Sequence, residues 1–183
     1  MLRDLLATLP KPDDNAELLV GNDTGDDAAV YRIDETRAIV ATTDFFMPVV
    51  DDPFDFGRIS ATNALSDVYA VGGRPILALA ICGMPIDKVT SEVIQGVLAG
   101  GAAVCKDAGV PVAGGHSIDT LEPIYGLAVI GMVDIANIKR NIGAKPDDVL
   151  ILGKGLGTGF MSNAVKSGTI SDSGYAEMIA STT

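Results

Sequence analysis

The chain has 183 residues, nearly half of them apolar, with a formal net charge of −11 and a pI near 4.3. This length suffices for one well-filled core, or for one domain and part of another. The acidic balance, without any Lys/Arg run, argues against binding to a nucleic-acid backbone. No apolar run approaches the ~20 residues of a membrane helix, and the start at Met1–Asp4 lacks the charged-then-apolar order of a secretory signal. We therefore expect a cytoplasmic protein.

Amphipathic and apolar stretches in chain order predict a mixture of strands and helices. Because the two types mix without strict βαβ alternation, an α+β domain fits better than a doubly wound sheet. Helices are expected at 55–71 and 90–108, and strands at 28–33, 38–43, 76–82, 110–113, 125–133 and 149–152.

The sequence pattern in the last part of the chain indicates the beginning of a second domain. A glycine-rich run, Gly153–Gly159, precedes a helical stretch, and another helical pattern covers 175–180. We expect an N-terminal domain over residues 1–155 and the start of a truncated C-terminal domain over 156–183. The glycine run has neither G-x-G-x-x-G spacing nor a Gly-Lys-Ser/Thr sequence, so any nucleotide binding requires a different fold.

The two cysteines, Cys82 and Cys105, lie far apart and fit neither a disulfide framework nor a zinc pair. We expect them to be buried small hydrophobic residues rather than reactive thiols.

A row of polar residues is expected along the first long helix. Ser60, Asn63 and Asp67 share one face by their spacing. This row could present an amide and a carboxylate to a metal–phosphate complex, or it could be a solvated polar stripe. Asp44, which ends the preceding strand and is reached by the same turn, favours the metal–phosphate site.

A second acidic group, Asp26-Asp27, follows a loop of turn-forming residues. Such carboxylates serve either as turn and capping groups or as cation ligands, and the sequence leaves both possibilities open. Mg²⁺ usually takes one or two protein carboxylates and keeps waters and phosphate oxygens, so Asp27 with Asp67 would make a reasonable half-site. Asp51-Asp52, just before Pro53, are expected to be structural turn residues.

Gly114-Gly115-His116-Ser117 follows a short apolar run. Two glycines allow close backbone approach to a ligand and leave N–H groups free for phosphate oxygens. A phosphate loop and a plain turn are equally compatible with this segment. His116 is the only histidine of the chain, which excludes a zinc site built on several histidines.

Together these segments resemble the selenophosphate synthetase (selenide, water dikinase) family. Two of these segments, the one with the acidic pair Asp26-Asp27 and the one with Leu65-Ser66-Asp67, are shared more loosely with thiamine-monophosphate kinase and aminoimidazole ribonucleotide synthetase. Phe45-Phe46 and residues 54–59 point to the selenophosphate branch. The resemblance runs in order through Leu19-Val20-Gly21-Asn22, Asp26-Asp27-Ala28-Ala29-Val30-Tyr31, Thr42-Thr43-Asp44-Phe45-Phe46, Asp52-Pro53-Phe54-Asp55-Phe56-Gly57-Arg58-Ile59, Ala61-Thr62-Asn63-Ala64-Leu65-Ser66-Asp67, Gly72-Gly73-Arg74-Pro75, Ala113-Gly114-Gly115-His116-Ser117-Ile118-Asp119, Glu122-Pro123 and Tyr125-Gly126-Leu127-Ala128-Val129.

The resemblance implies an α+β domain with a mixed or antiparallel sheet and flanking helices, which pairs with a second copy into an intersubunit β-barrel. It also implies ATP-dependent synthesis of selenophosphate from selenide and water, giving AMP and phosphate, with ATP near the dimer interface. Carried over by position, Asp27 and Asp67 would bind Mg²⁺. Contacts to ATP would come from Thr24, Gly25, Asp26, Asp44, Asn63, Asp67, Gly115, His116 and Ser117.

The chain departs from this family in two respects. The family's nucleophilic Cys or selenocysteine and its nearby Lys have no counterpart here, and neither Cys82 nor Cys105 lies at the matching place. The C-terminal domain, which supplies a further Mg²⁺-binding Asp, is also missing. We therefore predict no catalytic residue in this chain, expect Met1 to be an internal methionine of a longer protein, and expect the chain alone to be poorly active or inactive. The alternatives are a related small-molecule kinase, which would release ADP, and a non-catalytic nucleotide-binding or dimerisation module.

Overall fold

A computed structural model describes residues 15–183, and the prediction about Met1–Asp4 lies outside them. The chain forms a six-stranded sheet in the order β1-β2-β3-β6-β4-β5. All neighbouring strands are antiparallel except β4 and β5, which are parallel. The strands are β1 (Leu18–Val20), β2 (Ala29–Arg32), β3 (Arg37–Phe46), β4 (Arg74–Met84), β5 (Val112–Asp119) and β6 (Ile124–Asp134).

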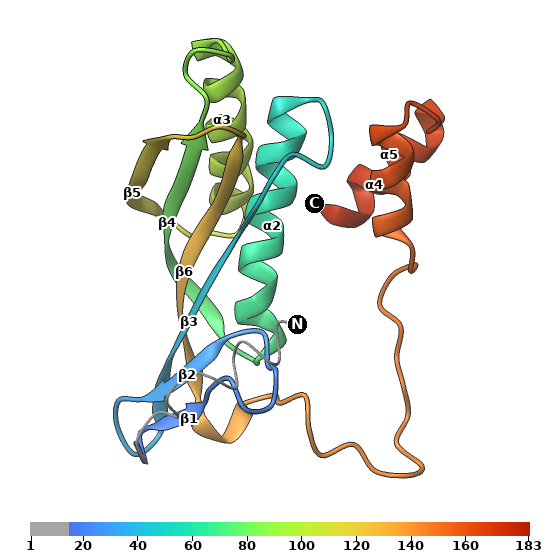
Figure 1. The fold of residues 1–183 in the computed structure, drawn as a ribbon. Coiled ribbons are helices and arrows are strands. Elements are labelled where there is room, and N and C mark those ends of the chain that lie inside the picture. Colours follow the sequence, from blue (N-terminus) through green and yellow to red (C-terminus); the bar gives the residue numbers. More distant parts are fainter. Residues whose placement is uncertain (1–14) are drawn as a thin grey trace.

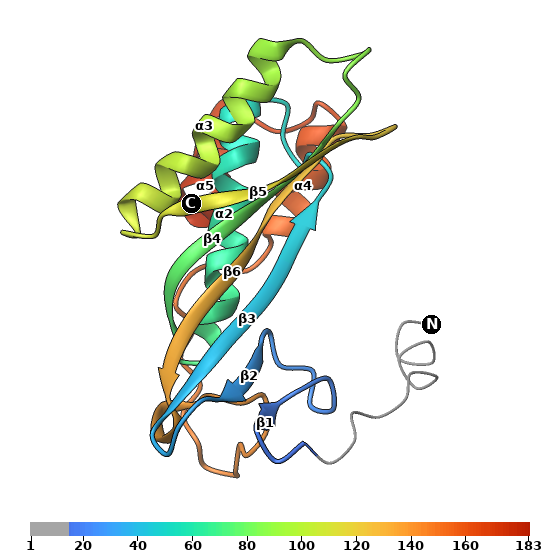
Figure 2. The same cartoon turned by 90° about the vertical axis from the view of Figure 1, so that its left-hand side faces the viewer.

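Two helices, α2 (Pro53–Ala70) and α3 (Ser91–Asp107), cover one face of the sheet (Figure 1). The strand pleat directs alternate side chains to this face. Along β6, Tyr125, Leu127 and Val129 are buried, and the Tyr125 ring lies 6.3 Å from the Phe56 ring of α2. Figure 2 looks onto the opposite face, where β3 and β6 run in front of α2 without a helix over them. The predicted α+β class with a mixed sheet is confirmed.

The two helices approach each other very closely because glycines stand at their contact. A Cβ on Gly57 of α2 would lie 2.0 Å from the Val97 carbonyl oxygen of α3. A Cβ on Gly100 of α3 would lie equally close, 2.0 Å, to the Phe54 carbonyl oxygen. Neither position accommodates a side chain without separating the helices.

The start of α2 is fixed by local sequence. Asp52 is the N-cap, and its carboxylate accepts a hydrogen bond from the Asp55 backbone N–H at 2.8 Å. Pro53 follows in the first turn, where its missing N–H costs nothing. Asp52 therefore has the structural role predicted for it, and the cap determines where the helix carrying Asn63 and Asp67 begins.

The C-terminal part consists of two short helices, α4 (Thr158–Lys166) and α5 (Asp172–Thr182), which pack against each other, and α5 also contacts α2. A long loop joins them to the short 3₁₀ helix η1 (Ile135–Asn137) after β6 (Figure 1). The predicted strand at 149–152 is wrong, because no strand among residues 15–183 pairs with that segment. Its side chains are exposed, Leu150 by 94% and Ile151 by 90%.

Most other predicted elements are confirmed, with ends that differ from the predicted ones by at most three residues. The sequence reasoning missed β1, which is only three residues long. It also placed the fifth strand too early, at 110–113 instead of Val112–Asp119, because Gly114 and Gly115 were interpreted as a loop. Within residues 15–183, no helix combines the length and the hydrophobicity needed to cross a bilayer.

Candidate acidic site

Three separate segments bring acidic and polar side chains together between β3 and α2. Thr42 and Asp44 lie on β3 at even positions, which point to the same side of the sheet as buried Val40. Asn63 and Asp67 lie one turn apart on α2, and Asp27 comes from the turn just before β2.

Hydrogen bonds connect these segments directly. The Thr42 hydroxyl lies 2.7 Å from Asp67 Oδ2 and 3.3 Å from the Asp27 backbone carbonyl oxygen. The Asn63 side-chain amide donates to Asp44 Oδ2. The structure therefore places Asp44 beside Asn63, and Asp67 beside the Asp27 segment.

The electrostatics of this site favour a cation. Burial raises the pKa of the Asp67 carboxyl, and the negative charges of Asp44 and Asp27 raise it further, against the hydrogen bond from Thr42. None of the ion pairs in the described part of the chain involves these three carboxylates. A partly buried carboxylate with like charges nearby and no cationic partner is typical of a ligand-binding site.

The donor set fits Mg²⁺ better than a metal that needs a complete protein cage. Among residues 15–183, no three His, Cys, Asp or Glu side chains converge to form a metal site by themselves. Mg²⁺ is bound by one or two carboxylates, with waters and substrate phosphates as its other ligands. Asp27 and Asp67 would be the carboxylates that hold it.

The loop of Thr24, Gly25 and Asp26 is held by a distant segment. The Asp26 carboxylate accepts hydrogen bonds from the Thr24 hydroxyl and the Asn141 backbone N–H, and both bonds, with the Arg140 charge, lower its pKa. The Asn141 side chain also donates to the Gly25 carbonyl oxygen at 2.8 Å. Sequence reasoning missed Asn141, and no local pattern marks a residue that contacts a loop more than a hundred positions earlier.

Gly115, His116 and Ser117 are not brought to the acidic residues within one chain, and they form a strand rather than the predicted loop. They lie on β5, the exposed outer strand. Asp44 pairs with Leu127 of β6, which pairs with Ala80 of β4, which pairs with Gly115. Three strand spacings amount to about 14 Å. A Cβ on Gly115 would lie 2.0 Å from the Ala80 carbonyl oxygen, so glycine is required there for strand pairing.

The predicted polar row on α2 is shorter than expected, because Ser60 does not belong to it. Ser60 is fully buried, and its hydroxyl donates to the Phe56 carbonyl oxygen at 2.9 Å. Phe56 itself is buried against Phe46 and Tyr125, so this turn of the helix faces the core. Of the three residues in this row, only Asn63 and Asp67 contribute to the acidic site.

The two cysteines have the structural role expected for them. Cys82 and Cys105 are free and buried, and burial raises the pKa of both thiols. Thiols in this state are weak nucleophiles because the thiolate is the reactive form.

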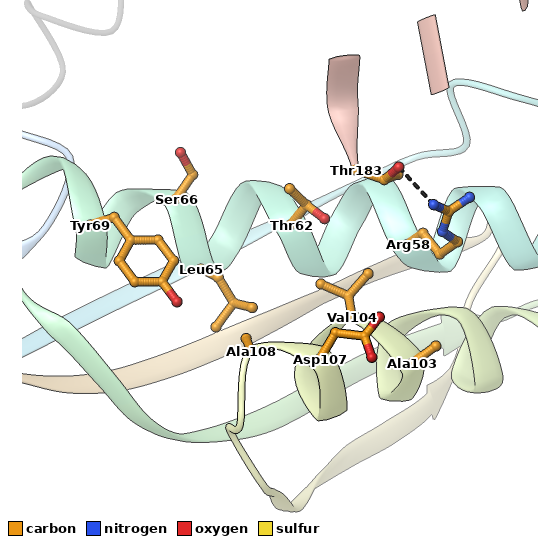
Figure 3. Close-up of a pocket in the computed structure, with 10 residues that line it drawn as sticks. All are labelled: Arg58, Thr62, Leu65, Ser66, Tyr69, Ala103, Val104, Asp107, Ala108 and Thr183. Atoms are coloured by element: carbon orange, nitrogen blue, oxygen red, sulfur yellow. Dashed lines mark hydrogen bonds between the residues drawn. The ribbon is translucent and has the colours of Figure 1, made fainter. Parts of the chain in front are cut away.

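A separate cavity of about 330 Å³ lies between α2 and α3 (Figure 3). Arg58 lines it and donates a hydrogen bond to the Thr183 hydroxyl at 2.8 Å. The Thr62 hydroxyl oxygen is buried and has no hydrogen-bond partner among the described residues. None of the residues predicted for ATP or Mg²⁺ binding lines this cavity, so it is distinct from the acidic site.

The chain is similar over its whole length to selenide, water dikinases. The chain is 62% identical over 183 residues to that of Burkholderia pseudomallei (strain K96243) and 59% identical to that of Rhizobium meliloti (strain 1021). Each alignment includes all of this chain and 52% of the relative, so the chain spans about half the length of these curated relatives.

Solved structures share the fold at lower identity. AaThiL complexed with AMPPCP and TMP matches with a TM-score of 0.61 at 21% identity, over 68% of this chain and 41% of that one. Thiamine-monophosphate kinase from Stenotrophomonas maltophilia K279a matches with a TM-score of 0.59 at 22% identity, over 86% and 50%. T. maritima PurL complexed with ATP matches with a TM-score of 0.51 at 19% identity, over 58% and 20%.

The sequence profile described as "AIR synthase related protein, N-terminal domain" matches residues 25–133, which is more than half of the chain. This range contains Asp27, Thr42, Asp44, Asn63 and Asp67, together with the sheet and helices that position them. The chain therefore belongs to the family of AIR synthase related proteins and contains its N-terminal domain.

Proposed function

We propose that this chain is the ATP- and Mg²⁺-binding half of an enzyme that makes selenophosphate from selenide and water, releasing AMP and phosphate. The observation that carries the proposal is Asp67, a partly buried carboxylate whose pKa is raised beside Asp27 and Asp44. High identity to relatives named selenide, water dikinase supports the choice of reaction.

The residues of the site divide into two groups. Asp27 and Asp67 would hold Mg²⁺ together with phosphate oxygens of ATP, and the ion would neutralise charge that develops on the transferred phosphoryl group. Asp44, which accepts a hydrogen bond from Asn63, would contact the nucleotide. The Thr24-Gly25-Asp26 loop, held by Asn141, would line the same site.

A homodimer would supply the remaining predicted contacts. Gly115, His116 and Ser117 lie three strand spacings from Asp44 in the same chain, so a bound nucleotide would meet them more readily from a second copy. The sheet face without helices is rich in exposed or half-buried apolar side chains, including Leu79 and Ile118. We propose that two copies pair through this face.

Catalysis would require the remainder of the full-length protein. We assign no catalytic nucleophile to this chain, since both of its cysteines are buried and have raised pKa values. We therefore expect the chain alone to bind nucleotide and metal without forming selenophosphate, and we expect the enzyme to act in the cytoplasm.

Calorimetric titration with ATP in the presence of Mg²⁺ tests the proposal. The wild-type chain should bind, and Asp67→Asn should lose most of this binding. Asp87→Asn is the matched control, because it removes the same charge from an exposed loop. Equal ATP binding by the wild type and Asp67→Asn would contradict the proposal.

A second candidate function is phosphorylation of a small molecule, favoured by the structural likeness to thiamine-monophosphate kinase. The nucleotide product distinguishes the two reactions in the full-length protein. AMP supports selenophosphate synthesis, whereas ADP with a phosphorylated small molecule supports a kinase. Nucleotide binding with neither product would indicate a non-catalytic module.

A further inference from the structure

We propose that Thr42 is a positioning residue whose hydroxyl holds Asp67 and the Asp27 segment in the arrangement that binds the metal. This inference rests on the proposed function, since it concerns the same site. It adds a residue to which neither the sequence patterns nor the resemblance gave a role.

The position of Thr42 makes it the bridge between two segments. It lies in the middle of β3, and its side chain points toward α2. Its hydroxyl oxygen is 2.7 Å from Asp67 Oδ2 on the helix and 3.3 Å from the Asp27 carbonyl oxygen before β2. One side chain on the central strand therefore contacts both segments that carry the proposed metal ligands.

The two contacts differ in kind. A hydroxyl has one proton to donate, and the shorter distance assigns that proton to Asp67. The longer contact, 3.3 Å to the Asp27 carbonyl oxygen, is the weaker of the two and keeps the Asp27 backbone close. When Oδ2 of Asp67 is held in this way, the carboxylate cannot rotate freely, and its other oxygen stays available for a cation.

Residues that hold metal ligands in place commonly contribute to metal affinity, and their loss costs about 10–100-fold. Asp67 depends on Thr42 in this sense, because the Thr42 hydroxyl is the side-chain group that hydrogen-bonds to it in the described structure. Valine has nearly the same shape as threonine and the same preference for strands. Thr42→Val therefore removes the hydrogen bond while retaining the packing.

The test measures the affinity of the 183-residue chain for Mn²⁺ in the presence of ATP, by electron paramagnetic resonance. We expect Thr42→Val to weaken Mn²⁺ binding by about 10–100-fold. Thr42→Ser, which restores the hydroxyl, should bind within a few-fold of the wild type. Thr36→Val is the matched control, because the Thr36 hydroxyl makes the same kind of bond to Asp34, at 3.0 Å, outside the site.

The outcomes separate this inference from the proposed function. If Thr42→Val binds Mn²⁺ as tightly as the wild type while Asp67→Asn loses it, Thr42 has no positioning role and the proposed function stands. If Asp67→Asn also binds normally, both proposals are wrong. Thermal melting shows whether each variant folds. Should Thr42→Val fail to fold, Thr42→Ala against Thr42→Ser gives the same comparison, and equal affinity of these two overturns the inference.

Discussion

At the scale of single residues, Asp67 determines how the protein responds to pH. Its carboxyl has a pKa raised above the ordinary value of 3.8, mainly because the group is partly buried. A raised pKa in the folded state means that the protonated form is favoured by folding. The resulting loss of stability is absent below pH 3.8, develops as the pH rises from 3.8 through the raised pKa, and is complete above the raised pKa.

Asp67→Asn should therefore stabilise the ligand-free protein at pH 7, because it removes an unfavourable charge. The melting temperature of the variant should exceed that of the wild type at pH 7, and the difference should disappear below pH 3.8. Differential scanning calorimetry at several pH values checks this. A lower melting temperature for Asp67→Asn at pH 7 would show that the carboxylate is not electrostatically strained. Functional sites commonly contain groups that lower the stability of the folded protein but are needed for ligand binding.

Asn141 gives a second prediction at this scale. Asn141→Ala removes the hydrogen bond to the Gly25 carbonyl oxygen. A hydrogen bond of this kind contributes about 0.5–1.5 kcal/mol to the stability of the folded state, so we expect the melting temperature to fall by about 2–4 °C. ATP affinity should also fall, because the Gly25 loop is held less firmly. Asn163→Ala, on the exposed side of α4, is the control. Unchanged ATP affinity would mean that the Gly25 loop does not contact the nucleotide.

At the scale of elements, close packing of α2 on α3 keeps Asn63 and Asp67 above β3. Gly57→Ala or Gly100→Ala would place a methyl group 2.0 Å from a carbonyl oxygen of the other helix. Such overpacking typically costs about 1–3 kcal/mol, which should appear as a lower denaturant midpoint. Gly159→Ala in α4 is the control, because a Cβ there meets open space. If both substitutions leave the midpoint unchanged, the helices are not in the contact described.

Prediction of elements from sequence succeeded where burial alternates and failed where it does not. Strand β6 and helix α2 follow their patterns of buried residues closely. Every residue of β5 is exposed, and two glycines lie within it, so neither the pattern nor the composition indicates a strand. The apolar segment 149–152 has the composition of a strand, yet a strand needs a neighbour to pair with, and none of the described strands lies beside it. Helix spacing indicated that Asn63 and Asp67 share one face of α2, whereas the contacts of Asn141 and Thr42 depend on tertiary structure.

At the scale of the whole molecule, the account predicts that two copies meet through the sheet face without helices. Leu79 on this face is 38% exposed, and Leu98 on the outer side of α3 is 39% exposed. Leu79→Glu should convert the dimer to a monomer in analytical ultracentrifugation, and Leu98→Glu should not. Loss of the dimer should also weaken ATP binding, because His116 of the partner would no longer approach the site. A chain that is monomeric before any substitution would contradict this arrangement.

The central claim is that Asp27 and Asp67 together bind a divalent cation with the nucleotide, and crystals grown with Mn²⁺ and a non-hydrolysable ATP analogue test it most directly. The account predicts an anomalous difference peak within about 2.0–2.4 Å of oxygens from both carboxylates. The analogue's phosphates should complete the coordination. A peak at some other place, or bound nucleotide with no metal while Asp67 contacts only Thr42, would contradict it.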